Sequence, residues 1–158
     1  MMRILFVCTG NTCRSPMAAA IARKIAAERG ITDLEITSAG TMAWDGQPAT
    51  DCAVLIGIER QWELDAHRSR TLTRELAEAQ DLILVMGTHH KERTEALGAA
   101  GKTFLLTTYA SHGAEDRSVA DPFGGDLETY RATADELEEA IRRVVDRLAA
   151  ERTPDLPS

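Results

Sequence analysis

The sequence predicts an α/β domain with a parallel sheet at its centre. Short apolar runs alternate along the chain with longer segments of helical periodicity, and this alternation is typical of parallel sheets that helices cover on both faces. The chain has 158 residues, which is the length of one domain, and 44% of them are hydrophobic. A single domain of this length can bury a sizeable core.

The predicted elements follow from local patterns. Apolar or alternating runs are predicted as four strands, which span residues 3–7, 34–39, 81–86 and 101–106. Five segments are predicted as helices: 16–29, 49–58, 73–79, 88–97 and a final helix whose apolar residues run from Leu127 to Leu148. The connecting loops are predicted at 40–48, 59–72 and 107–125. The expected fold is therefore three-layered and Rossmann-like, with a four-stranded parallel sheet flanked by helices.

Several helix ends carry their own signals. Ser15 and Pro16 are predicted as the cap and the first position of the first helix, and Gly30 as the glycine that closes it. Thr73 is predicted to cap a short helix. In the final helix apolar residues recur at steps of three and four, with acidic residues near its start and arginines near its end. These signals support the helix boundaries given above.

Composition restricts the classes of function and the cellular setting. The net charge is −7 without a basic run, so no nucleic-acid partner is expected. No apolar stretch approaches the roughly 18 residues of a membrane span, so no membrane partner is expected either. Three cysteines and the lack of a signal-peptide pattern at the N-terminus predict a cytoplasmic protein. We expect one domain, residues 1–152, followed by a flexible tail, residues 153–158.

The segment from Cys8 to Ser15 has the pattern C-x5-R-[ST] and lies between the first strand and the first helix. A turn of this size points successive backbone N–H groups at one spot beside the positive end of the helix, which suits a tetrahedral dianion. These groups and Arg14 favour the thiolate form of Cys8. Gly10 and Asn11 are expected to adopt positive φ. The segment therefore predicts a phosphate-binding loop that contains its own nucleophile.

The string C-T-G-N-T-C-R-S-P-M, which begins at Cys8, resembles the signature loop of the low-molecular-weight protein tyrosine phosphatase family. Its residues most closely resemble those of the bacterial protein-arginine phosphatase branch of that family. A second string, D-P-F-G-G from Asp121 to Gly125, falls where the family keeps its general acid. The resemblance therefore covers nearly the whole chain.

The resemblance implies a cysteine-dependent phosphatase that works through a phosphocysteine intermediate, without a metal ion or another cofactor. It implies that Cys8 is the nucleophile, Arg14 binds the phosphoryl group and Asp121 is the general acid. The other members of the implied phosphate-binding loop are Thr9, Gly10, Asn11, Thr12, Cys13 and Ser15.

The resemblance also implies three supporting roles. Ser15 donates a hydrogen bond to the catalytic sulfur, a role compatible with its predicted capping. Asn11 locks the loop through hydrogen bonds with Ser38 and His67. Cys13 captures an oxidised nucleophile as a reversible disulfide, the alternative being a small apolar residue that packs beneath the loop.

Substrate selectivity is expected at Thr12, Phe123 and Trp44. By resemblance, tyrosine-directed members usually carry a bulkier aliphatic residue at the first position, whereas arginine phosphatases carry threonine, which leaves room and polarity for a guanidinium group. Phe123 agrees with the arginine branch, whereas Trp44 is familiar among tyrosine-directed enzymes. We therefore expect hydrolysis of phosphoarginine on proteins or peptides by a monomer or weak dimer, with protein-tyrosine phosphatase activity as the alternative.

Other functions fit these residues less well. An arsenate reductase of this fold needs a further cysteine pair near residues 80–90, and residues 81–97 contain no cysteine. A phosphocysteine carrier needs no aspartate acid, and a phosphoprotein-binding module would have an impaired nucleophile or acid. Cys52 is expected to be structural. The adjacent His89 and His90 are expected to face different sides of their helix and to bind no metal.

Overall fold

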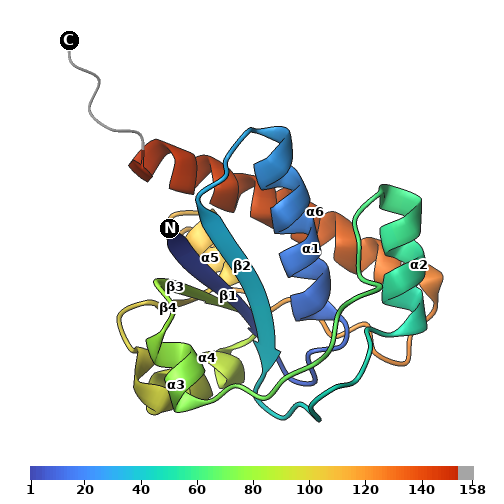
Figure 1. The fold of residues 1–158 in the computed structure, drawn as a ribbon, viewed down its shortest axis with the longest axis horizontal. Coiled ribbons are helices and arrows are strands. Elements are labelled where there is room, and N and C mark those ends of the chain that lie inside the picture. The colour runs from blue at the N-terminus through green and yellow to red at the C-terminus, as the bar shows by residue number, and fades with distance from the viewer. Residues whose placement is uncertain (153–158) are drawn as a thin grey trace.

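A computed structural model of the chain describes residues 1–152 and confirms the predicted architecture (Figure 1). Four parallel strands form one sheet in the order β2-β1-β3-β4. The strands are β1 (Met2–Cys8), β2 (Leu34–Gly40), β3 (Leu82–Val85) and β4 (Thr103–Leu105). The helical elements are α1 (Arg14–Glu28), α2 (Asp51–Arg60), α3 (Arg74–Glu78), α4 (Thr88–Thr94), the π-helical turn η1 (Glu95–Ala99), α5 (Leu106–Ala110) and α6 (Leu127–Arg152). The tail predicted at residues 153–158 lies outside the described residues.

The sheet has one buried layer on each face because side chains along a strand alternate between the faces. In β1, Ile4 and Phe6 belong to the core that α1, α5 and α6 cover, whereas Leu5 and Val7 belong to the core beneath α3 and η1. Each of these four side chains is at most 2% exposed. A strand buried on both faces reads as a continuous apolar run, which is what the sequence has there.

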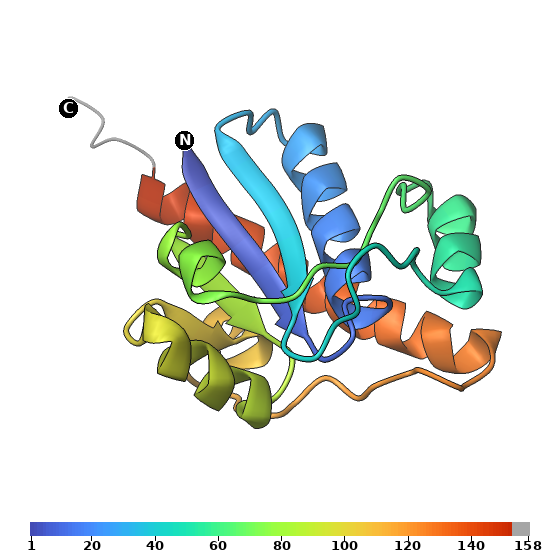
Figure 2. The same cartoon turned by 60° about the horizontal axis from the view of Figure 1, so that its bottom comes forward.

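Helices α1 and α6 pack against each other on one side of the sheet (Figures 1 and 2). The apolar stripe predicted for the final helix faces this contact, and Leu137 and Ile141 are fully buried in it. This packing supports the N-terminal end of α1, where the loop after β1 leads into the helix. Among residues 1–152, none of the helices combines the length and the apolar character needed to cross a membrane.

The predicted loop at residues 107–125 is wrong at its start, where the chain forms the short helix α5. Tyr109 in α5 is 6% exposed, lies 5.5 Å from the Phe104 ring between centroids, and carries the Arg147 guanidinium 3.9 Å above its ring. Tertiary packing therefore stabilises a helix too short to form by its own propensity. The fourth strand is also shorter than predicted, since only Thr103–Leu105 pair with β3.

Candidate active site

The loop between β1 and α1 lies at the carboxyl edge of the sheet, where ligands of open parallel sheets bind. The chain after β2 runs beside this loop, since the N–H of Thr41 donates to the Cys8 carbonyl at 2.9 Å. Gly40, the last residue of β2, makes this approach possible. A Cβ there would lie 2.4 Å from the Thr9 carbonyl oxygen, a distance that real Cβ contacts do not reach, so no other residue fits without moving the loop.

Asn11 lies at the centre of the loop and is fully buried. Its φ is 58°, the left-handed conformation that asparagine tolerates better than most residues. The side-chain amide donates to the hydroxyls of Ser15 and Ser38 at 2.8 and 2.9 Å, and its oxygen accepts the Arg70 N–H at 2.9 Å. His67 Nε2 lies 2.7 Å from the Asn11 carbonyl oxygen. The loop is thus tied to β2 and to the segment that follows α2.

Cys8 is the last residue of β1 and is 3% exposed. Its sulfur lies 2.9 Å from the hydroxyl oxygen of Ser15. The Ser15 hydroxyl also accepts from Asn11, so it is oriented by the same network that shapes the loop. A hydroxyl held at this distance can donate to a thiolate without first reorganising.

Two local predictions for this loop are wrong. Helix α1 begins at Arg14 with Cys13 as its N-cap, so Ser15 and Pro16 occupy the second and third helical positions. The Ser15 hydroxyl faces the loop, and Pro16 is tolerated because N–H groups in the first turn have no intrahelical partner. Gly10 does not adopt positive φ; of the two residues expected to do so, only Asn11 does.

Arg14 extends from the start of α1 into the site and is 5% exposed. Its Nη1 donates to the carbonyl of Val119 at 2.9 Å, and its Nη2 lies 3.6 Å from Asp121 Oδ2. The Asp121 carboxylate is half exposed, and its Oδ1 accepts the N–H of Phe123 at 3.0 Å. The loop before α6 therefore brings a carboxylate and a buried guanidinium together beside the loop after β1.

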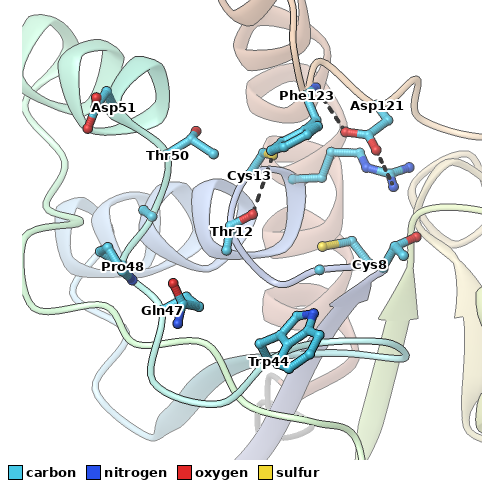
Figure 3. Close-up of a pocket in the computed structure, with 14 residues that line it drawn as sticks. Cys8, Thr12, Cys13, Trp44, Gln47, Pro48, Thr50, Asp51, Asp121 and Phe123 are labelled. Atoms are coloured by element: carbon cyan, nitrogen blue, oxygen red, sulfur yellow. Dashed lines mark hydrogen bonds and ion pairs between the residues drawn. The ribbon is translucent and has the colours of Figure 1, made fainter.

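These residues line a cavity of about 820 Å³ (Figure 3). Figure 3 shows Trp44 and Phe123 at opposite edges of this cavity, with Thr12 and Cys8 between them. Trp44 is 82% exposed and Phe123 70%, so neither aromatic ring is committed to the core. The remaining lining residues are Thr9, Gly10, Cys13, Arg14, Gln47, Pro48, Ala49, Thr50, Asp51 and Asp121.

Cys13 lines the cavity near Phe123 (Figure 3) and is 5% exposed. The Tyr130 hydroxyl of α6 lies 3.7 Å from its sulfur and accepts a hydrogen bond from the Thr50 hydroxyl at 3.1 Å. The Thr50 N–H in turn donates to the Thr12 carbonyl at 2.9 Å. Burial raises the pKa of the Cys13 thiol above its ordinary value. Cys8 and Cys13 are both free thiols.

His90 belongs to this site, although no pattern in the sequence predicts that it does. Its Nε2 lies 2.8 Å from the hydroxyl oxygen of Thr9. The signal that could have found it is topological: β3 lies beside β1 in the sheet, so residues after β3 reach the residues after β1. The rings of His89 and His90 lie 3.9 Å apart between centroids. Within residues 1–152 no group of His, Cys, Asp or Glu side chains is arranged to hold a metal ion.

Comparison with known proteins places this site in a family. Residues 3–153 match the family model described as low molecular weight phosphotyrosine protein phosphatase. The protein-arginine-phosphatase of Bacillus subtilis (strain 168) is 42% identical over 155 residues, covering 96% of this chain and 99% of its own. A low molecular weight protein-tyrosine-phosphatase of Staphylococcus haemolyticus is 36% identical, covering 86% of this chain and 92% of its own.

Solved structures agree with the sequence relatives. A YwlE arginine phosphatase variant with a phosphorylated active-site serine superposes with a TM-score of 0.90 at 40% identity, covering 96% of this chain and 98% of its own. The match extends over the strands, the loop after β1 and the long C-terminal helix, because it spans almost the whole of both chains. The chain belongs to the low-molecular-weight phosphotyrosine protein phosphatase family.

Proposed function

We propose that this protein is a protein-arginine phosphatase that hydrolyses phosphoarginine on proteins through a phosphocysteine intermediate. The observation that carries the choice of substrate is the position of Thr12, whose short polar side chain lines the cavity beside Cys8, between the two aromatic edges. The 42% identity to a protein-arginine-phosphatase over nearly the full length of both chains supports the same choice.

In the proposed first step, the Cys8 thiolate attacks phosphorus in line with the departing nitrogen of the substrate. A P–S bond forms and the P–N bond breaks, while Asp121 gives its proton to the leaving nitrogen. Arg14 and the N–H groups of the loop hold the phosphoryl oxygens and stabilise the charge that spreads over them in the transition state. The Ser15 hydroxyl, 2.9 Å from the sulfur, stabilises the thiolate.

In the proposed second step, a water molecule attacks the phosphocysteine. Asp121, now a carboxylate, accepts the proton of this water as the P–O bond forms and the S–P bond breaks. The products are inorganic phosphate and the Cys8 thiolate, which is ready for another cycle. The anchoring of the short loop before α6, through the Val119 carbonyl to Arg14, supports both of these proposed roles of Asp121.

Hydrolysis of phosphotyrosine is the second candidate function. The 36% identity to a protein-tyrosine-phosphatase supports it, and so does Trp44 at the edge of the cavity, where it could flank an aryl ring. The two candidates use the same nucleophile and acid, so they differ only in what the walls of the cavity accept.

The deciding experiment compares kcat/KM for phosphoarginine and phosphotyrosine peptides in the wild type, Thr12→Ile and Thr12→Val. We expect the wild type to prefer phosphoarginine and Thr12→Ile to reverse the preference, with changes of about 10- to 200-fold for an added methylene group. Thr12→Val keeps the branched shape and removes the hydroxyl, so it distinguishes the effect of side-chain size from the effect of the polar group. A wild type that prefers phosphotyrosine, with little change in Thr12→Ile, would contradict the choice of substrate and leave the chemistry intact.

We infer that Cys13 protects the nucleophile against oxidation. Peroxide would convert the Cys8 thiolate to a sulfenic acid with release of hydroxide, and the Cys13 thiol would displace water from it to form a disulfide. Both thiols are free and lie on one loop, which supports this role. The raised pKa of Cys13 keeps this residue in its thiol form.

The proposed setting is the cytoplasm, where the nucleophile would stay reduced, and the proposed partners are phosphorylated proteins or peptides. The relatives named above support the partner class, since both are protein phosphatases by name. We propose that the protein works as a monomer or weak dimer, which sedimentation of the purified chain at micromolar concentration tests directly.

A further inference from the structure

The contact between Thr9 and His90 joins the loop after β1 to helix α4. Thr9 follows Cys8 directly and lines the cavity, while His90 is fully buried behind it. The 2.8 Å separation of Thr9 Oγ1 and His90 Nε2 is a hydrogen bond in which either atom can be the donor. The direction of this bond decides what the Thr9 hydroxyl can do for the substrate.

The surroundings of the other ring nitrogen, Nδ1, indicate which of the two residues is the donor. His90 Nδ1 is buried and has no hydrogen-bond partner among the described residues. A neutral imidazole carries its proton on one nitrogen only, so a proton on Nδ1 would be a buried donor without an acceptor. Buried N–H groups without partners are rarer than unpaired acceptors. The tautomer with its proton on Nε2 avoids this, and it makes His90 the donor to Thr9.

The ring stays neutral because its surroundings oppose a positive charge. Burial lowers the pKa of His90 to about 3, with the charges of His89 and Arg14 acting in the same direction. Thr9, the hydrogen-bond partner of Nε2, carries no charge. The arrangement therefore persists at any pH at which the proposed enzyme would work.

We propose that His90 is a positioning residue that donates its Nε2–H to Thr9 and so leaves the Thr9 hydroxyl proton free to point at the bound phosphoryl group. If His90 accepted instead, the Thr9 hydroxyl would donate its proton to Nε2 and could not donate to the phosphoryl group. Thr9 thereby becomes a side-chain donor to the phosphoryl oxygens, in addition to Arg14 and the backbone N–H groups. This inference rests on the proposed phosphatase chemistry of the site and is independent of whether the substrate is phosphoarginine or phosphotyrosine.

A nitrogen NMR measurement tests the tautomer without any turnover. The protein is labelled with ¹⁵N-histidine, and the His90 signals are assigned by their loss in His90→Gln. We expect protonated Nε2 and unprotonated Nδ1, unchanged from about pH 5 to about pH 8, where an ordinary histidine titrates. A protonated Nδ1, or a ring that titrates in this range, would overturn the inference even if the enzyme proves to be a phosphatase.

Kinetics with an aryl phosphate test the role of the hydroxyl. We expect Thr9→Val and His90→Phe each to lower kcat about tenfold, a modest effect for a transition-state donor, with KM little changed. The double variant should lose no more than Thr9→Val alone, because His90 acts only through the Thr9 hydroxyl that Thr9→Val has already removed. His90→Gln should retain most of the activity, since its amide N–H can replace Nε2–H.

Two controls separate this role from a structural one. Thr108→Val removes the same hydroxyl from α5, outside the cavity, and should leave kcat unchanged. Far-ultraviolet circular dichroism and unfolding in urea identify a His90→Phe variant that fails to fold, and Thr9→Val then carries the test alone. Unchanged kcat in Thr9→Val would refute the role of Thr9 as a donor. Cys8→Ser is a separate test of the phosphatase mechanism, in which we expect the loss of all turnover.

Discussion

Replacing Asn11 with alanine should destabilise the protein more than any other single change in the loop. The change removes three side-chain hydrogen bonds, to Ser15, Ser38 and the N–H of Arg70. At about 1 kcal/mol each these amount to about 3 kcal/mol. Alanine at a φ of 58° adds about 1 kcal/mol of backbone strain. The expected loss of about 4 kcal/mol is a large part of the roughly 5–15 kcal/mol that stabilises a typical domain.

Unfolding in urea measures this loss, and two further variants divide it. Asn11→Gly removes the same hydrogen bonds without the strain, so it should be less destabilised than Asn11→Ala by about 1 kcal/mol. Gln80→Ala is the matched control, because Gln80 is a buried amide with one side-chain hydrogen bond, to the Leu76 carbonyl, and should cost about 1 kcal/mol. If Asn11→Ala loses no more than this control, Asn11 does not anchor the loop.

Three further outcomes are expected. Asp121→Asn should lower kcat by about 10²- to 10⁴-fold, and less so with a nitrophenyl leaving group, which needs no proton; equal losses for all leaving groups in rapid-mixing assays would argue against an acid. After peroxide treatment the wild type should regain activity with a thiol reductant while Cys13→Ser should not, and mass spectrometry would show a higher oxide of Cys8 in the variant. Because burial lowers the folded-state pKa of His90 to about 3, the unfolded chain binds more protons between that value and about pH 6.5, so the free energy of unfolding should fall as the pH drops through this window. His90→Gln should fall less steeply in urea unfolding at matched pH values.

The sequence predicts the sheet well because β1 and β3 are buried on both faces and leave a continuous apolar pattern. The loop after β1 is predictable for a different reason. Its residue types are demanded by local chemistry, as with Asn11 in a left-handed conformation and Arg14 at the positive end of a helix, where a cation needs an anion nearby.

The errors arise where distant contacts override local patterns. Ser15 is a residue type that commonly caps helices, yet its hydroxyl interacts with Cys8 and Asn11 instead. Helix α5 forms because Tyr109 packs against α6, and His90 joins the site because β3 lies beside β1. The contacts of Tyr109 and His90 join residues that are far apart in the sequence, so patterns among neighbouring residues cannot predict them.

The long span between Arg14 and its acceptor affects when the protein can first act. Cys8, the proposed nucleophile, and its loop leave the ribosome early. The Arg14 guanidinium, however, is held by the carbonyl of Val119, 105 residues later, and Cys13 by Tyr130, 117 residues later. A nascent chain therefore carries the signature loop for most of its synthesis without a formed site. We therefore expect turnover to appear only once the last helix has docked, so that its appearance would mark the completion of folding.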